Sequence, residues 1–412
     1  MPFGPVPFGP VPTLTKRSRM RSSDLASQYG FDQHECSIRD WSVDLAAGLP
    51  PCDDEWEETG TFPWSVLEQL AESSGALALT FPARHAGREG SRMDAILLVE
   101  QLAMRSFVVA EAVHLALNGP AYFLAKFGAS ELASRWLPPV AAGKALVSIA
   151  ITEESAGTAL GDISTRFDPH AGGIRVEGRK CFVTGGALAA AHLVVGRFGG
   201  EGSRGLGAVL VPAGTRGLSV ERTYRKMGGN ALPEAAIRFE DAWVPQDHVL
   251  IPGDPMSSAG LKEILRQYGA MRLGIAAMCI GTAQGVLDRV VDHLRTREQG
   301  GRRLADHQGV RWTWARLALD LEQARLLTYR AARTVDEDGL PSASQATMAK
   351  LAASEVAVAI TQQAIQAFGW RGIARGREFP VERVARETRG WTIAGGTTES
   401  LLNSLAHDLL DD

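Results

Sequence analysis

The chain lacks the features that mark several classes of protein. It has four widely spaced cysteines in 412 residues and no CxxC pair, so we expect free thiols in a reducing compartment rather than a disulfide scaffold. Neither sign of charge dominates, because 43 Lys and Arg stand against 47 Asp and Glu for a formal net charge of −4. The chain therefore has no overall field that would attract nucleic acid or an anionic membrane.

Long apolar runs are also missing. The longest, residues 273–283, contains two glycines and is too short to cross a bilayer. Near the start, a Phe-Gly-Pro-Val-Pro pattern occurs twice, at 3–7 and 8–12. Because proline and glycine cannot sustain a helix there, we interpret residues 1–25 as a flexible tail rather than a signal peptide. These features predict a soluble cytoplasmic protein with no membrane segment.

Common catalytic motifs are missing as well. The nine histidines are scattered, no two stand at metal-ligand spacing on one helix, and HExxH does not occur. We therefore predict no metal site. Gly205-Leu206-Gly207 runs into a strand pattern instead of opening a helix, which is the wrong context for a dinucleotide-binding loop.

What the chain does have is an ordinary globular composition, 45% hydrophobic and 22% charged. Its hydrophobic pattern changes twice. Apolar residues stand at helical spacing up to about residue 138, as at Val66, Leu67 and Leu70. Short alternating segments such as 173–178 follow and indicate strands. From about residue 257, long helical patterns return over 261–297, 304–335 and 344–368.

This order predicts a mainly α fold with a central β domain. We expect a flexible tail (1–25), an N-terminal helical domain (26–145), a central β domain (146–255) and a C-terminal helical domain (256–412). Segregation of helices and strands along the chain favours separate layers or domains over a doubly wound parallel sheet.

Six stretches carry the information on function. They are Thr-Glu-Glu-Ser-Ala-Gly-Thr at 152–158, Gly-Arg-Lys-Cys-Phe-Val-Thr-Gly-Gly at 178–186, Arg-Glu-Gln-Gly-Gly at 297–301, Asp-His-Gln at 306–308 with Leu-Glu-Gln-Ala-Arg at 321–325, Phe-Pro-Val-Glu-Arg at 379–383, and Gly-Thr-Thr-Glu at 396–399. In order and spacing they resemble motifs of the acyl-CoA dehydrogenase flavoproteins, which read roughly TEPxAGSD, GxKxxITNG, RxxFG, DxQ with ExAR, YPVER and EGTxE. The resemblance covers about residues 37–410.

The resemblance implies an N-terminal helical domain, a central β-barrel and a C-terminal four-helix bundle, usually in a homo-oligomer (a dimer or tetramer). It also implies noncovalent FAD between the barrel and the bundle. Carried over residue by residue, the predicted FAD contacts are Thr152, Thr158, Phe182, Thr184, Arg297, Gln366, Gly369, Thr397 and Glu399. Two departures bear on this site, because Trp370 stands at a family glycine and Gly300 at a family phenylalanine.

The expected chemistry is the α,β-oxidation of an acyl thioester, bound to CoA or to a carrier protein, with electrons passed to an acceptor. The family's usual base glutamate precedes Gly-Thr of the EGT motif, where this chain has Gly395. The alternative family position precedes an arginine that resembles Arg272, and Met271 stands there. Both positions usually occupied by the base therefore lack a carboxylate.

We assign Arg272, Tyr268 and Gly395 to substrate binding and leave the base unidentified, with Glu153, Glu154, Tyr268 and Glu399 as local candidates. Two alternatives remain open. The fold could host a flavin monooxygenase, which needs no α-proton base, and the small Gly395 and Gly396 would give it space. The chain could also be a non-catalytic subunit that pairs with an active homologue.

Overall fold

The computed structural model describes residues 22–376 and 380–410. The predicted tail up to residue 21 and Phe379 of the fifth motif lie outside this part. The chain begins with helices: α1 (Ser22–Tyr29), α2 (Gln33–Ala47), α3 (Asp53–Thr59), α4 (Trp64–Ser74), α5 (Arg92–Ala103), α6 (Phe107–Leu117), α7 (Pro120–Phe127) and α8 (Ser130–Ala141). Several begin at side-chain caps, such as Asp32 at α2 and Ser91 at α5, each in a capping box.

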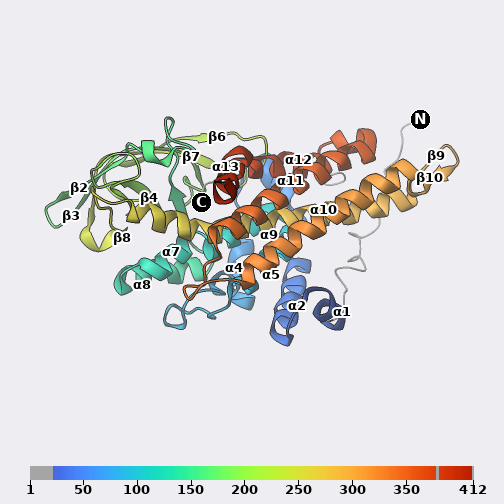
Figure 1. The fold of residues 1–412 in the computed structure, drawn as a ribbon, viewed down its shortest axis with the longest axis horizontal. Helices are drawn as coiled ribbons and strands as arrows, with labels where there is room; N and C mark the ends of the chain where they lie inside the picture. Colours follow the sequence, from blue (N-terminus) through green and yellow to red (C-terminus); the bar gives the residue numbers. More distant parts are fainter. Residues whose placement is uncertain (1–21, 377–379, 411–412) are drawn as a thin grey trace.

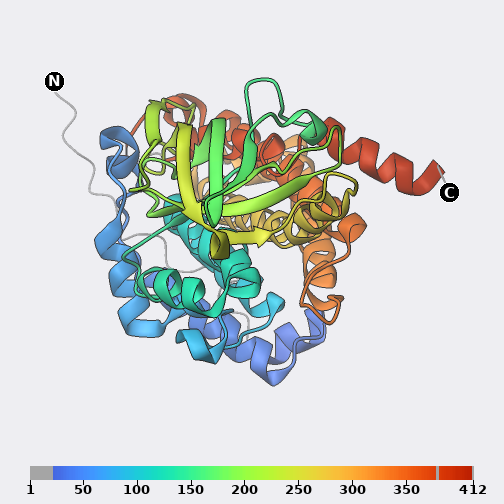
Figure 2. The same ribbon diagram turned by 90° about the vertical axis from the view of Figure 1, so that its left-hand side faces the viewer.

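The strands follow as one sheet: β1 (Val147–Ala150), β2 (Arg166–His170), β3 (Gly173–Thr184), β4 (Ala191–Arg197), β5 (Leu206–Pro212), β6 (Leu218–Tyr224), β7 (Glu234–Pro245) and β8 (Val249–Ile251). Their order is β6-β7-β3-β2-β4-β5-β8, with β1 paired to β4. Figure 2 shows the sheet in front of the helices. The strand expected over 173–178 continues to Thr184, because β3 pairs with β7 along its length through two irregularities in register.

Helices then return: α9 (Ala259–Thr296), α10 (Gln308–Arg333), α11 (Ala343–Phe368), α12 (Val381–Arg389) and α13 (Thr398–Leu410). A hairpin of β9 (Glu298–Gln299) and β10 (Arg302–Arg303) joins α9 to α10. Gly300 and Gly301 form its turn with φ of +59° and +78°, the left-handed conformation that a two-residue hairpin favours. The predicted α, β, α organisation is confirmed. The divisions near residues 145 and 255 fall between helices and strands, and we propose them as domain boundaries.

Helix α9 runs through the middle of the molecule and contacts both the N-terminal and the C-terminal helices (Figure 1). Its glycines allow this close approach. A Cβ at Gly281 would lie 2.1 Å from the carbonyl oxygen of Glu100 in α5, and one at Gly274 would lie 2.0 Å from His114 Nδ1 in α6. Since real side chains do not tolerate such contacts, glycine at these positions sets the distance between the helices.

A buried ionic network ties the same helices together. The Arg325 guanidinium of α10 donates to Glu100 Oε1 at 3.0 Å and to Gln284 Oε1 of α9 at 2.9 Å. The Tyr329 hydroxyl donates to the other oxygen of Glu100 at 2.7 Å. Burying the charges of Arg325 and Glu100 without these partners would cost free energy of folding. The network therefore fixes α5, α9 and α10 relative to one another.

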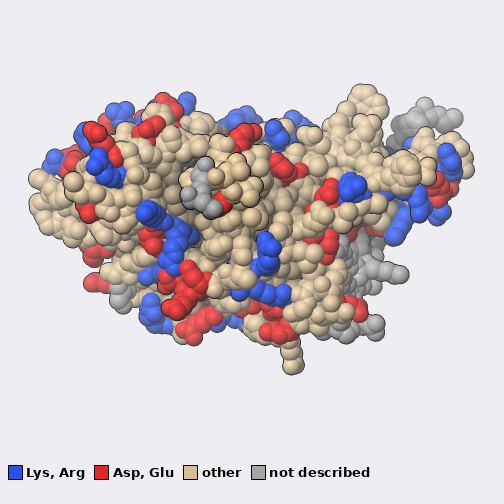
Figure 3. All heavy atoms as spheres, in the orientation of Figure 1, with Lys and Arg blue, Asp and Glu red and all other residues tan. Residues whose placement is uncertain are grey.

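The surface mixes both signs of charge, and Figure 3 shows Lys and Arg interspersed with Asp and Glu on one face. Within the described residues, two helical segments are long and apolar enough to cross a membrane by composition, Phe107–Phe127 and Ala259–Thr296. Of their apolar windows, 94% and 89% are buried inside the fold. This burial is what core helices require.

Candidate functional site

An exposed aromatic edge marks the end of strand β3. Lys180 and Val183 flank an irregularity in the β3–β7 pairing, and Phe182 there has a φ of +52°, which is unusual for a residue with a side chain. Phe182 is turned outward with 59% of its surface exposed and stacks on Tyr224 of β6, with ring centroids 4.3 Å apart. The bulge therefore presents a flat aromatic surface beside Thr184.

The first motif lies next to this edge. The Cys181 amide donates to the Thr152 carbonyl oxygen at 2.9 Å, so Thr152 and Phe182 are held close together. Thr158 lies in the exposed loop that follows.

Glu153, one of the candidate bases, is part of the framework of this loop. Its two oxygens accept hydrogen bonds from the backbone and hydroxyl groups of Ser164 and Thr165, at 2.6–3.0 Å, and from Lys180 Nζ at 2.8 Å. Burial opposes its ionisation, but Lys180 and the hydroxyls outweigh burial and lower the pKa of Glu153 to about 2. A carboxylate so saturated has no free lone pair for a substrate. Glu154 is exposed and pairs with Arg179 at 3.0 Å.

Two cations hold the turn at the expected base position. The Arg272 Nε of α9 donates to the Gly395 carbonyl oxygen at 3.0 Å, and Lys350 Nζ of α11 donates to the Gly396 carbonyl oxygen at 2.7 Å. Gly395 is buried with a φ of +76°. No described residue accepts a hydrogen bond from its N–H. The turn therefore presents a fixed backbone donor.

Lys350 is fully buried, and burial lowers its pKa to about 8. Arg272 also donates to Thr347 Oγ1 at 3.1 Å, and burial lowers its pKa. Within the described residues, neither cation forms an ion pair with a carboxylate. The turn consequently lies in a region of positive charge.

A third cluster joins the β domain to the helices. Glu234 opens β7 directly opposite Thr184, and the Thr184 hydroxyl donates to Glu234 Oε1 at 3.1 Å. Lys226 Nζ donates to the same oxygen at 3.2 Å and to the Leu232 carbonyl oxygen at 3.1 Å. Glu234 Oε2 is buried and has no partner among the described residues. Burial raises the pKa of Glu234 despite the opposing charge of Lys226.

Two further groups lie within electrostatic range of Glu234. Burial raises the pKa of Glu111 in α6 to about 8, and its Oε2 also has no described partner. Tyr268 of α9 is half-buried, burial raises the pKa of its phenol, and Glu234 raises it further. The Tyr268 ring lies 5.9 Å from the Arg272 guanidinium, which connects this cluster to the 395 turn.

The remaining predicted FAD contacts divide into two places. Thr397 Oγ1 accepts from the Ser400 amide at 3.2 Å at the start of α13, where Glu399 is exposed. Arg297, Gln366 and Gly369 are exposed at the other end of α9 and α11, where His293 stacks on Phe368 with centroids 4.3 Å apart. Trp370 beside them is 85% exposed, so it points outward and does not fill the Gly369 turn.

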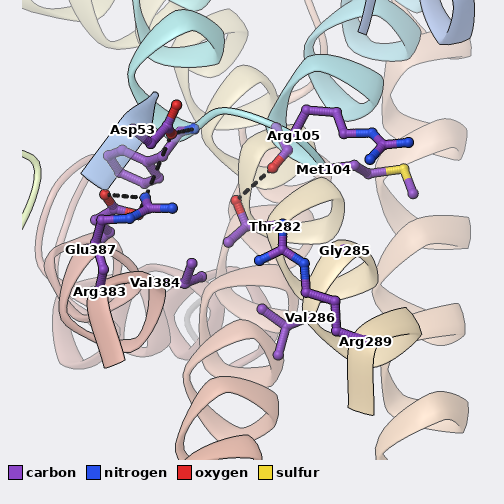
Figure 4. Close-up of a pocket in the computed structure, with 12 residues that line it drawn as sticks. Asp53, Met104, Arg105, Thr282, Gly285, Val286, Arg289, Arg383, Val384 and Glu387 are labelled. Atoms are coloured by element: carbon purple, nitrogen blue, oxygen red, sulfur yellow. Dashed lines mark hydrogen bonds and ion pairs between the residues drawn. The ribbon is translucent and has the colours of Figure 1, made fainter. Parts of the chain in front are cut away.

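A small cavity of about 20 Å³ lies elsewhere, between α3, α5, α9 and α12, and has room for about one water. Figure 4 shows Arg383 between Asp53 and Glu387 on its wall. Arg383 donates to both oxygens of Glu387 at 2.7 and 2.8 Å. Its ionic pairs connect the N-terminal helices to α12, and we assign it a structural role.

Sequence reasoning missed Glu234, Lys226, Lys350 and Glu111. Glu234 lies in none of the six motifs, and its pairing with Thr184 spans fifty residues. Lys350 carried a usable signal, because it is a single lysine on the alanine face formed by Ala346, Ala349, Ala353 and Ala357 of a buried helix.

Comparison with known proteins gives the family. Models of the acyl-CoA dehydrogenase N-terminal, middle and C-terminal domains match residues 37–144, 148–242 and 258–410. The chain belongs to the acyl-CoA dehydrogenase family. It is 32% identical over 367 residues to a 3-sulfinopropanoyl-CoA desulfinase of Paraburkholderia xenovorans, covering 88% of this chain and 92% of that protein.

Two other relatives of this acyl-CoA dehydrogenase-family chain are informative. Subunit CarC of the caffeyl-CoA reductase-Etf complex of Acetobacterium woodii is 32% identical, over 84% of this chain and 89% of CarC. The butyryl-CoA dehydrogenase structure from Megasphaera elsdenii has a TM-score of 0.84 and 26% identity, over 92% and 99% of the two chains.

The family makes the chain a flavoprotein-type oxidoreductase, and FAD, predicted from the motifs, is confirmed as its cofactor. The residues present fit a flavin ring. The outward Phe182 and Tyr224 offer an aromatic surface, and Thr184 stands at its edge, where its hydroxyl donates to Glu234.

Glu153→Gln tests the structural role of Glu153. Removing one charge from the buried pair leaves Lys180 uncompensated, so we expect a loss of about 3–5 kcal/mol in unfolding free energy. The exposed neighbour gives the control, Glu154→Gln, for which we expect a change under about 1 kcal/mol. The stabilisation from Glu153 is present above the unfolded pKa of 4.5 and is lost as pH falls through about 2. Denaturant unfolding at several pH values measures the loss of stability in each variant and its pH dependence. Equal losses in Glu153→Gln and Glu154→Gln would contradict the structural role of Glu153.

Gly395→Ala tests the fixed turn. An alanine at φ +76° costs about 1–2 kcal/mol, and its Cβ would press on Ile275 Cδ1 at 2.8 Å. The matched control is Gly390→Ala, at φ −60° with open space around its Cβ, where we expect no loss of stability. Thermal unfolding compares them. A Gly395→Ala protein as stable as the control would show that the turn does not hold this conformation.

Proposed function

We propose that the chain is an FAD-dependent oxidoreductase that oxidises the α,β bond of an acyl thioester. Its proton acceptor lies at neither residue 271 nor residue 395. The observation that carries this proposal is the unused N–H of Gly395, held in a buried turn by Arg272 and Lys350. A fixed backbone donor of this kind polarises a thioester carbonyl and makes the α-hydrogen acidic. The site therefore keeps the activating half of the chemistry although the glutamate side chain is missing.

The predicted FAD contacts support binding across two copies of the chain. Thr152, Thr158, Phe182, Thr184, Thr397 and Glu399 belong to one group, and Arg297, Gln366 and Gly369 to the other. Along α9, Arg297 lies about 37 Å from Arg272, at 1.5 Å per residue, which is too far for one FAD to reach both within a chain. The Arg297 group would thus hold the diphosphate of FAD in a neighbouring copy, and we propose a homo-oligomer.

When bound, FAD supplies the two-electron acceptor for the hydride that leaves the β-carbon. Phe182 would cover one face of its ring, and Thr184 and Thr152 would bond its edge. Arg272 and Tyr268 would shape the acyl site on the other side.

The names of the relatives suggest the carrier and the electron acceptor. These names include CoA thioesters and, for one relative, a complex with Etf. We propose acyl-CoA, with acyl carrier protein as the other possible carrier, and an electron-transferring flavoprotein as acceptor, in the cytoplasm.

An acyl group with an anionic substituent is the second candidate substrate. Arg272 and Lys350 place two cations without a described carboxylate partner at the turn, and a relative's name specifies a sulfinopropanoyl group. Release of sulfite from 3-sulfinopropanoyl-CoA would favour this substrate.

The direct test is anaerobic titration of the FAD-loaded protein with a panel of CoA and carrier-protein thioesters. We expect at least one thioester to bleach the flavin absorbance, since α,β-oxidation reduces the flavin. Bleaching only by NAD(P)H or a flavin reductase, followed by oxygen uptake, would indicate a monooxygenase. A protein that binds neither flavin nor thioester would be a non-catalytic subunit, and the proposal would be wrong.

Phe182→Ala tests the flavin surface. Loss of one stacked aromatic ring is worth about 0.5–1.5 kcal/mol, so we expect FAD to bind roughly 2- to 12-fold more weakly with little change in folding. Fluorescence titration of the apoprotein with FAD measures the affinity. Met256→Ala, another exposed apolar side chain, is the control and should bind FAD as the wild type does. An unchanged affinity in Phe182→Ala would place the flavin elsewhere.

A further inference from the structure

We propose that Glu234 is the catalytic residue that accepts the α-proton of the thioester, in place of the glutamate missing at positions 395 and 271. This inference rests on the proposed function and adds the one group that the proposal leaves unidentified. It is carried by the position of Glu234, by the two different states of its oxygens and by the groups around it.

The position follows from the strand register. Glu234 pairs with Thr184 on one side and with Tyr224 on the other. Residues opposite one another across neighbouring strands point to the same face of a sheet, so Thr184, Glu234 and Tyr224 form one row. Phe182 stacks on Tyr224. A flavin ring at this edge would therefore lie directly beside the Glu234 carboxylate.

The two oxygens of Glu234 differ in a way that suits a proton acceptor. Oε1 is held by the Thr184 hydroxyl and by Lys226 Nζ, which fix the carboxylate and favour its anionic form. Oε2 is buried and accepts no hydrogen bond from a described residue. A general base needs one free lone pair on a positioned group, and Oε2 supplies it.

Glu153 shows the contrast within the same domain. All of its acceptor capacity is used by Ser164, Thr165 and Lys180. Glu234 has two donors on one oxygen and none on the other. The comparison separates a carboxylate whose oxygens are all used in the loop from one that keeps a buried oxygen without a described partner.

Four groups from different elements interact with Glu234. Thr184 on β3 and Lys226 on the loop before β7 donate to it, and Glu111 on α6 and Tyr268 on α9 lie within electrostatic range. Burial keeps Glu111 largely protonated near neutral pH, because its pKa is raised to about 8. A protonated Glu111 cannot accept the substrate proton, so Glu111 is a weaker candidate for the base than Glu234. Tyr268 extends from this cluster toward Arg272, which donates to the Gly395 carbonyl.

The proton-transfer step balances as follows. The Cα–H bond breaks, its proton joins Oε2 of Glu234, and its electron pair forms the Cα=Cβ bond. FAD, when bound, would supply the acceptor for the β-hydrogen as hydride, so the two electrons lost by the acyl group would balance those gained by the cofactor. Lys226 remains protonated and stabilises the carboxylate before the transfer.

Glu234→Gln is the decisive variant. The amide oxygen can still accept from Thr184 and Lys226, but it cannot take a proton. We expect FAD and thioester affinity close to wild type, and a roughly 10²–10⁴-fold slower flavin reduction. Glu234→Asp should give an intermediate rate. The control is Glu240→Gln, an exposed residue on the same strand, which should match the wild type.

A second readout separates proton transfer from oxidation. Acetyl-CoA has α-hydrogens but no β-carbon, so exchange of its α-hydrogens in D₂O by the FAD-loaded protein reports proton abstraction alone. We expect exchange by the wild type and Glu240→Gln and its loss in Glu234→Gln. Exchange that persists in Glu234→Gln, or no exchange in the wild type, would overturn the inference. Glu234-dependent exchange without flavin bleaching by any thioester would instead refute the proposed oxidation and leave Glu234 as the proton acceptor.

A third readout needs no cofactor. Burial raises the pKa of Glu234, so the infrared band of protonated carboxyls in the apoprotein, followed with pH, should lose a component with a raised pKa in Glu234→Gln. Glu240→Gln should keep that component, and Glu111 remains present in both variants. A component with a raised pKa that is the same in the two variants would show that it does not come from Glu234 and would contradict the assigned role.

Discussion

The close packing of α9 against α5 and α6 is the constraint on which the rest of the molecule depends. Gly274 and Gly281 allow backbone and side chains of the neighbouring helices to approach to distances that any Cβ would forbid. The buried Arg325–Glu100 pair then fixes the helices in that arrangement. Because α9 is held in this way, its first half carries Tyr268 and Arg272 to the β domain and the 395 turn. Its C-terminal end carries Arg297 to the opposite end of the molecule.

Much of the fold could be predicted from the sequence because it depends on local pattern. The change from helical spacing to alternation and back predicted the α, β, α order, and the motifs predicted the family. The bulge at Phe182 could not be predicted, because its positive φ arises from a register shift against β7. The position of Glu234 could not be predicted either, because it depends on pairing with Thr184, a cross-strand partner fifty residues away. Glu153 stood in a matching motif, yet its hydrogen bonds to Ser164, Thr165 and Lys180 give it a structural role.

In the mechanism that we propose, two tasks that one family glutamate would combine fall to different parts of the chain. The Gly395 N–H would polarise the thioester, in a turn that Arg272 and Lys350 hold through its two carbonyl groups. Glu234 would take the proton from the β domain, on the strand edge that carries Thr184. The two cations near Gly395 have no described carboxylate partner, and a positive turn of this kind would favour the negatively charged transition state of the proposed reaction.

The most direct measurement is a crystal structure of the protein with FAD and a non-oxidisable acyl-CoA analogue. Our account predicts the thioester carbonyl oxygen on the Gly395 N–H, and Glu234 Oε2 roughly 3–3.5 Å from the α-carbon, the separation of a reactive pair. A thioester bound with its α-carbon on the far side of the flavin from Glu234, or with its carbonyl away from Gly395, would contradict it.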